Sequence, residues 1–144
     1  MTDGKPSVTL VRRIKAPAQK IYEAWTDPVK LARWWAPPGI VAVLGVEADP
    51  RVGGAYRIRM RGADGVEYEA HGVYRELQPP EKLVFSWALN PGSGRRSAVT
   101  VALRADGAAT ELTLTHEGDA DPATWAERHR GWSATLDRLE REFD

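Results

Sequence analysis

Apolar and polar residues alternate along the middle of the chain, between residues 40 and 117. The stretches "YRIRM", "LVFSWAL" and "SAVTVAL" all repeat with a period of two. This period is typical of β-strands that bury one face and expose the other. Asp64-Gly65, which lies between two such stretches, is a tight-turn pair and predicts a β-hairpin. We therefore expect a one-sided antiparallel sheet, whose apolar face needs a cover.

The C-terminal segment has the spacing of a long helix that would supply this cover. Asp121 and Pro122 are suited to open the helix, and the apolar positions then step by four or three residues over about five turns. Such steps place the positions on one face of a helix. They are Trp125, His129, Trp132, Leu136, Leu139 and Phe143.

Two shorter helices are predicted near the start of the chain. The strand-like run "SVTLVRRI" ends before Pro17, after which apolar residues recur at helical spacing. Asp27 can cap a second short helix with Pro28 in its first turn, and Pro37 stops that helix because it cannot donate a backbone hydrogen bond. The predicted fold class is therefore α+β. It is a helix-grip arrangement, in which a curved antiparallel sheet wraps around a long C-terminal helix and two short helices lie between the first two strands.

Composition narrows the classes of protein and site that need to be considered. A length of 144 residues fits a single domain over residues 1–144, of which we expect residues 1–7 to be flexible. There is no cysteine and there are three scattered histidines, so disulfides and thiolate chemistry are excluded, and neither a metal site nor a cofactor is expected. The 20 basic and 20 acidic residues are mixed, which is not typical of a nucleic-acid-binding face. We see no signal segment and no membrane span, and therefore expect a cytoplasmic protein without membrane insertion.

Two adjacent tryptophans, Trp34 and Trp35, lie in the stretch "LARWWAPP". Neighbouring residues leave a helix about 100° apart, so the two indoles cannot both point straight into the same core. Either both fill core and rim, or one packs in the core while the other overhangs the mouth of a cavity and offers its ring to a ligand. Trp35 is our preferred cavity residue because it adjoins the proline loop, but the sequence does not decide which of the two faces the cavity.

The inward face of the predicted sheet mixes large apolar residues with small and polar ones. Ala70 and Gly72 leave room at its centre, and the aromatic and histidine side chains carry polar tips that need partners when buried. A ligand cavity between sheet and helix explains this mixture, whereas tight packing without a cavity is the alternative. The predicted cavity residues are Trp35, Tyr56, Ile58, Tyr68, Tyr74, Trp87, His116, His129, Trp132 and Leu136.

His116 is the single weak candidate for a catalytic role. It ends an apolar strand and could exchange a proton with a bound ligand, although a lone inward histidine is more often a hydrogen-bonded core or rim residue. The histidines lack metal-ligand spacing, and no Ser, His, Asp arrangement indicates a nucleophile. The residues therefore favour ligand binding over catalysis.

Six stretches of the sequence, taken in order, resemble one known family. Together they are similar to the bacterial branch of the proteins related to the activator of the heat-shock protein 90 ATPase, within the START-like (SRPBCC) superfamily, over about residues 8–142. The resemblance implies the helix-grip fold and a deep cavity that holds hydrophobic or amphipathic small molecules. The stretches are "VRRIKAPAQKIYEAWTDPVKLARWW", "DPRVGGAYRIRM", "GVYRELQPPEKLVFSW", "SAVTVAL", "TELTLTHEG" and "HRGWSATLDRLE".

This resemblance implies no reaction, because proteins of this fold include enzymes, carriers and regulators. We favour a carrier or sensor that binds a lipid-like or polyketide-like molecule in the cavity. The alternative is an enzyme of the polyketide cyclase/aromatase or hydratase type that uses the same cavity. A chaperone ATPase regulator is a second alternative, and only the family name suggests that chaperone contact. An exposed edge strand could also pair two copies into a homodimer.

Overall fold

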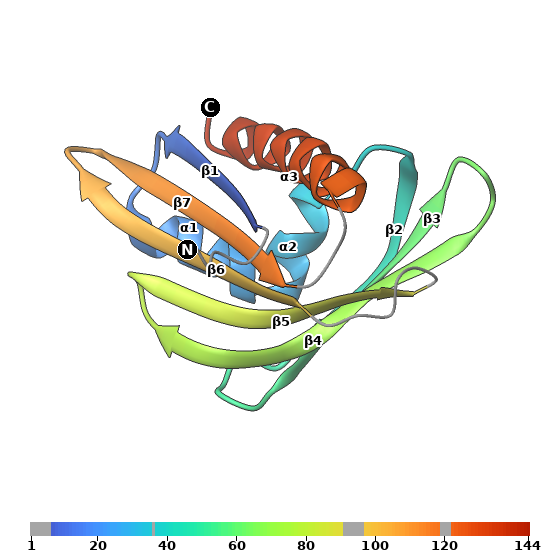
Figure 1. Cartoon of the computed structure of the whole chain (residues 1–144). Helices are drawn as coiled ribbons and strands as arrows, with labels where there is room; N and C mark the ends of the chain where they lie inside the picture. The colour runs from blue at the N-terminus through green and yellow to red at the C-terminus, as the bar shows by residue number, and fades with distance from the viewer. Residues whose placement is uncertain (1–6, 36, 91–96, 119–121) are drawn as a thin grey trace, which may run out of the picture.

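The computed structural model describes residues 7–35, 37–90, 97–118 and 122–144. It confirms the predicted α+β helix-grip fold, although Asp121 and residues 1–6 lie outside the described residues (Figure 1). Ser7, which we expected to be flexible, instead pairs with Glu117 in the sheet. The elements are β1 (Ser7–Ile14), α1 (Ala18–Thr26), α2 (Pro28–Trp34), β2 (Ile40–Ala48), β3 (Ala55–Gly62), β4 (Glu67–Gln78), β5 (Lys82–Asn90), β6 (Ser97–Asp106), β7 (Ala109–Gly118) and α3 (Pro122–Glu142).

The strands form one antiparallel sheet in the order β1-β7-β6-β5-β4-β3-β2. Figure 1 shows this sheet curled around α3, with α1 and α2 in the connection between β1 and β2. The alternation in the sequence has the predicted consequence: in β3 the buried residues are Tyr56, Ile58, Met60 and Gly62, with exposed residues between them. No helix among the described residues has the length and apolarity needed to cross a membrane.

Local chemistry at Asp27 explains the boundary between the two short helices. The Asp27 Oδ1 atom accepts hydrogen bonds from the backbone N–H groups of Val29 at 2.9 Å and Lys30 at 3.4 Å. Asp27 is therefore the N-cap of α2, and Pro28 occupies the first turn, where a missing N–H costs nothing. The helix ends at Trp34, so the two tryptophans leave the chain from different backbone conformations.

Gly72 has a different role from the one its size suggested. A Cβ atom at this position would lie 2.0 Å from the Ser86 carbonyl oxygen, so β4 and β5 approach each other too closely for any other residue. Here Tyr56 Oη donates to the Ser86 carbonyl at 2.7 Å and the Val73 N–H donates to Ser86 Oγ at 2.9 Å. The glycine therefore permits a close strand contact and does not leave room for a ligand.

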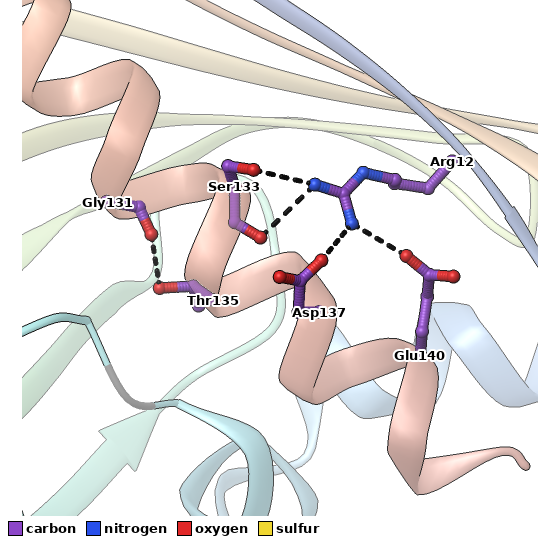
Figure 2. A network of polar contacts seen from close by, with 6 residues as sticks. All are labelled: Arg12, Gly131, Ser133, Thr135, Asp137 and Glu140. Carbon is purple, nitrogen blue, oxygen red and sulfur yellow. Dashed lines mark hydrogen bonds and ion pairs between the residues drawn. The ribbon is translucent and has the colours of Figure 1, made fainter.

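A polar network attaches the edge strand β1 to the outer side of α3 (Figure 2). The Arg12 guanidinium donates to Asp137 at 2.5 Å and Glu140 at 2.7 Å through Nη1, and to Ser133 Oγ at 2.9 Å through Nη2. The Arg12 side chain is 18% exposed, so these bonds are partly shielded from water. They fix the distance between strand and helix at this end of the molecule.

We expect Arg12→Met to lower the free energy of unfolding by about 1–2 kcal/mol, because several charge-assisted bonds to a partly buried guanidinium are lost together. The matched control is Arg13→Met. Arg13 pairs with Asp106 on the exposed side of β1, with a side chain that is 62% exposed, and its loss should cost less than about 0.5 kcal/mol. Urea unfolding of the two variants measures the difference, and equal losses would contradict the shielding of Arg12.

Candidate functional site

A cavity of about 790 Å³ lies between the N-terminal half of α3 and the concave side of the sheet. This volume is in the range of small-molecule sites in proteins. Its walls come from α3, the strands β2, β3, β4, β5 and β7, and the segment that follows α2. Pro38, Asp64, Glu127 and Arg130 also line it and are exposed, so they form its rim.

Three indoles form a continuous aromatic wall in this cavity. The ring centroid of Trp35 lies 5.6 Å from that of Trp87 and 5.5 Å from that of Trp132. Trp87 and Trp132 are 5.4 Å apart, and Trp35 also donates from Nε1 to the Met60 sulfur at 3.2 Å. Each ring packs against the other two, so the wall is formed without a ligand.

The structure assigns different places to the two adjacent tryptophans. Trp34 is 1% exposed, packs edge-on against Trp25 at 4.7 Å and does not line the cavity. Trp35 lines the cavity but is itself only 3% exposed. Trp35 is thus the cavity residue of the pair, but it is part of the inner wall and does not overhang the mouth.

The cavity brings together half of the residues predicted to line it. Tyr56, Ile58 and Tyr74 lie in the core instead, and Leu136 is fully buried beneath the helix. Their side chains point inward, as the alternation requires, but they pack against other core side chains and do not border the cavity. The predicted residues that line the cavity are Trp35, Tyr68, Trp87, His116 and Trp132.

The prediction that His129 lines the cavity is wrong, because this residue is exposed and is not part of the wall. The reason is the orientation of α3. The cavity is lined by Thr124, Arg128, Gly131 and Thr135, which step by four, three and four residues. At about 100° per residue, this face is roughly 90° away from the apolar face that packs on the sheet, and His129 lies on the far side of that apolar face.

His116 is held by hydrogen bonds on both ring nitrogens. An indole N–H only donates, so Nδ1 accepts from Trp132 Nε1 at 3.0 Å and the ring proton is on Nε2. Nε2 donates to Ser97 Oγ at 2.5 Å, and Ser97 Oγ donates to the Trp87 carbonyl at 3.4 Å. Burial, and to a smaller extent the positive charge of Arg128, lowers the pKa of His116 to about 3. The ring is therefore a neutral link between sheet and helix, and it has no nitrogen left for a ligand.

Arg128 is a cavity residue that the sequence interpretation missed. Its guanidinium lies over the ring of Trp125, 4.7 Å from the centroid, and its Nη1 atom is buried with no hydrogen-bond partner among the described residues. Burial lowers the pKa of Arg128, and the neighbouring Glu127 opposes this effect. In the sequence, the only signal for this residue was its helical spacing from Thr124, Gly131 and Thr135, with which it shares one face of the helix. That set of residues is too short and too mixed in character to be recognised as a cavity face.

A second hollow, of about 620 Å³, lies on the outward side of β2 to β5. Its charged residues pair with one another: Arg57 contacts both Glu47 and Glu69. Because these charges satisfy each other at an exposed surface, this hollow is a weaker candidate for a ligand site than the aromatic cavity.

Known proteins match the chain along almost its whole length. Residues 15–144 match the family described as Activator of Hsp90 ATPase homolog 1-like protein, which confirms the resemblance seen in the sequence. Among solved structures, protein CV1439 from Chromobacterium violaceum is 30% identical with a TM-score of 0.84, covering 95% of this chain and 96% of that one. A putative uncharacterized protein from Rhizobium leguminosarum is 26% identical with a TM-score of 0.80, covering 96% and 93%. The AHSA1 (SPO3351) protein from Silicibacter pomeroyi is 24% identical with a TM-score of 0.82, covering 95% and 96%. No curated protein matches the chain significantly.

Proposed function

The chain belongs to the Activator of Hsp90 ATPase homolog 1-like family, and from this premise we propose that it binds a hydrophobic or amphipathic small molecule in the cavity beside α3, as a carrier or sensor. The fold family commonly binds hydrophobic ligands. The observation that carries the proposal is the preformed wall of Trp35, Trp87 and Trp132.

The chemistry of the wall supports a ligand of this kind. Apolar surface that leaves water contributes roughly 25 cal/mol per Å², and the half-buried ring of Trp87 offers such surface, with the nearly buried rings of Trp35 and Trp132 packed against it. The wall is already packed, so a ligand would not have to order it. Lipid-like and polyketide-like molecules both meet these requirements.

A catalytic role in the same cavity receives less support. A cyclase or hydratase would need a titratable group that is free to exchange a proton with the ligand. Both nitrogens of His116 are engaged, and the Tyr68 hydroxyl donates to the exposed Asp64 carboxylate at 2.8 Å. A chaperone-regulating surface is not favoured either, because the large exposed apolar residues in the described part of the chain are single valines spread over separate segments.

Gly131 offers a clean test of the cavity. It lies on the cavity side of α3, and a Cβ atom placed there has no heavy atom within 4 Å. Gly131→Leu would therefore place a branched side chain inside the cavity, where it obstructs a ligand without disturbing the core. Compared with the wild-type protein, the free energy of unfolding of this variant should be unchanged or higher by about 0.5–1 kcal/mol, because glycine is unfavourable inside a helix.

We expect a thermal-shift screen with fatty acids, polyketide-like aromatics, flavonoids and sterols to find ligands for the wild-type protein. A ligand at 100 times its Kd stabilises the folded state by about 2.7 kcal/mol. Gly131→Leu should lose this stabilisation, and the control variant Gly131→Ala should keep it. If no class of compound shifts the wild-type protein, or if Gly131→Leu binds equally well, ligand binding in this cavity is not the function.

A further inference from the structure

The cavity contains one charge that faces inward among the described residues. Arg128 lines the wall, and its Nη1 atom is buried without a hydrogen-bond partner. None of the ion pairs among the described residues includes its guanidinium. An unpaired buried N–H on a charged group is costly, and such groups in native structures are normally satisfied.

The surroundings of Arg128 keep the charge in place but do not neutralise it. The Trp125 ring stabilises one face of the guanidinium through a cation–π contact, at 4.7 Å from the ring centroid. Burial lowers the pKa of Arg128, yet an arginine side chain stays protonated in proteins. The cavity wall therefore carries a partly buried positive charge, and no carboxylate of the described residues forms an ion pair with it.

None of the other polar groups that the structure describes in the wall supplies that anion. His116 is neutral and uses both nitrogens. The Asp64 carboxylate is at the exposed rim and already accepts from the Val66 N–H at 2.9 Å and from Tyr68 Oη at 2.8 Å. Glu127 is exposed, and the second cation of the wall, Arg130, is exposed too.

We propose that the ligand of this cavity is an amphipathic carboxylic acid, whose carboxylate pairs with the partly exposed guanidinium of Arg128 while its apolar part lies against the wall of Trp35, Trp87 and Trp132. The inference rests on the proposed function and names the class of ligand. A planar guanidinium matches the geometry of a carboxylate, and a single inward cation balances a single negative charge better than the double charge of a phosphate monoester.

The experiment compares acids with neutral molecules of the same apolar part. Decanoate is paired with decanol, and naphthoate with naphthylmethanol, so that both an aliphatic and an aromatic tail are covered. Titration calorimetry measures the Kd of each probe for the wild-type protein and for the variants Arg128→Gln and Arg138→Gln. Arg138 is an exposed cation on the same helix, away from the cavity, and is the matched control.

We expect the wild-type protein to bind at least one acid about tenfold more tightly than its neutral partner, as a charge-assisted hydrogen bond in a shielded site would give. Arg128→Gln should remove this preference and still bind the neutral probe, whereas Arg138→Gln should keep the preference. Thermal unfolding of Arg128→Gln should show only a small change in stability, because the lost cation–π contact with Trp125 is offset by the removal of an unpaired buried donor.

The possible failures can be told apart. Equal affinity for acid and neutral probe in the wild-type protein, or an acid preference that survives in Arg128→Gln, would overturn the role of Arg128 and leave ligand binding in the cavity intact. Binding of none of the four probes, together with an empty wider screen, would overturn the proposed function and this inference with it.

Discussion

Replacing Trp34 with alanine is expected to lower the free energy of unfolding by about 3–5 kcal/mol, the range for truncation of a large aromatic side chain in a core. Trp34 is 1% exposed and packs against Trp25 at 4.7 Å. Its Nε1 atom donates to the Ala24 carbonyl at 2.9 Å. This carbonyl depends on the indole, because the residue four positions later is Pro28, which has no N–H to complete the helical bond.

The informative control is Trp35→Ala, because Trp35 is the next residue along the chain but has different surroundings. One side of Trp35 already borders the cavity, and its Nε1 donates to a sulfur, which is a weak acceptor. Its truncation should therefore cost less than that of Trp34, while it removes part of the ligand wall. Urea unfolding of both variants decides the order, and a loss for Trp34→Ala that is no larger than that for Trp35→Ala would contradict the assignment of the two places.

Acid is expected to destabilise the protein through His116. Its pKa is lowered to about 3 in the folded state, below the value of about 6.5 for an unfolded chain. Between these two values the unfolded state binds a proton that the folded state does not. The stabilisation is therefore complete above about pH 6.5 and is lost as the pH falls toward 3, at up to about 1.4 kcal/mol per pH unit.

This slope predicts a loss of about 2 kcal/mol from His116 alone when the pH falls from 7 to 5. Urea unfolding at both pH values should show this loss in the wild-type protein and a smaller one in His116→Gln, whose amide can keep both hydrogen bonds. Carboxylates such as Glu23 and Asp64, whose pKa values are lowered by hydrogen bonds, titrate in both proteins, so their effects cancel in the difference. His129→Gln, on the exposed side of α3, should behave like the wild-type protein. Parallel slopes for wild type and His116→Gln would show that His116 is not held neutral.

Much of the fold could be predicted from the sequence because periodicity reports which face of an element is buried. The period of two in "YRIRM" corresponds to the buried residues of β3, and the steps of four and three correspond to the face of α3 that carries Trp132, Leu136 and Leu139. Asp27 and Pro28 marked the start of α2 for a local reason, since a cap and a first turn involve only adjacent residues.

The site was predicted less completely, because burial alone does not tell a cavity wall from a packed core. Tyr56 and Tyr68 belong to neighbouring strands and both turn toward the inside, but Tyr56 ends in the core and Tyr68 at the cavity. Likewise, Gly72 looked like a source of free space, and it is instead required by a close contact between two strands.

By itself the sequence determined the order and type of the elements and the inward faces of the strands, since these depend on interactions between residues near one another in the chain. Only the tertiary structure decided where α3 is separated from the curled sheet and which face of α3 borders the cavity. That position turns the stripe of Thr124, Arg128 and Gly131 toward the cavity and leaves His129 in solvent. The orientation results from contacts between segments far apart in the chain, such as Arg12 with Asp137 and Trp132 with His116, which no local pattern records.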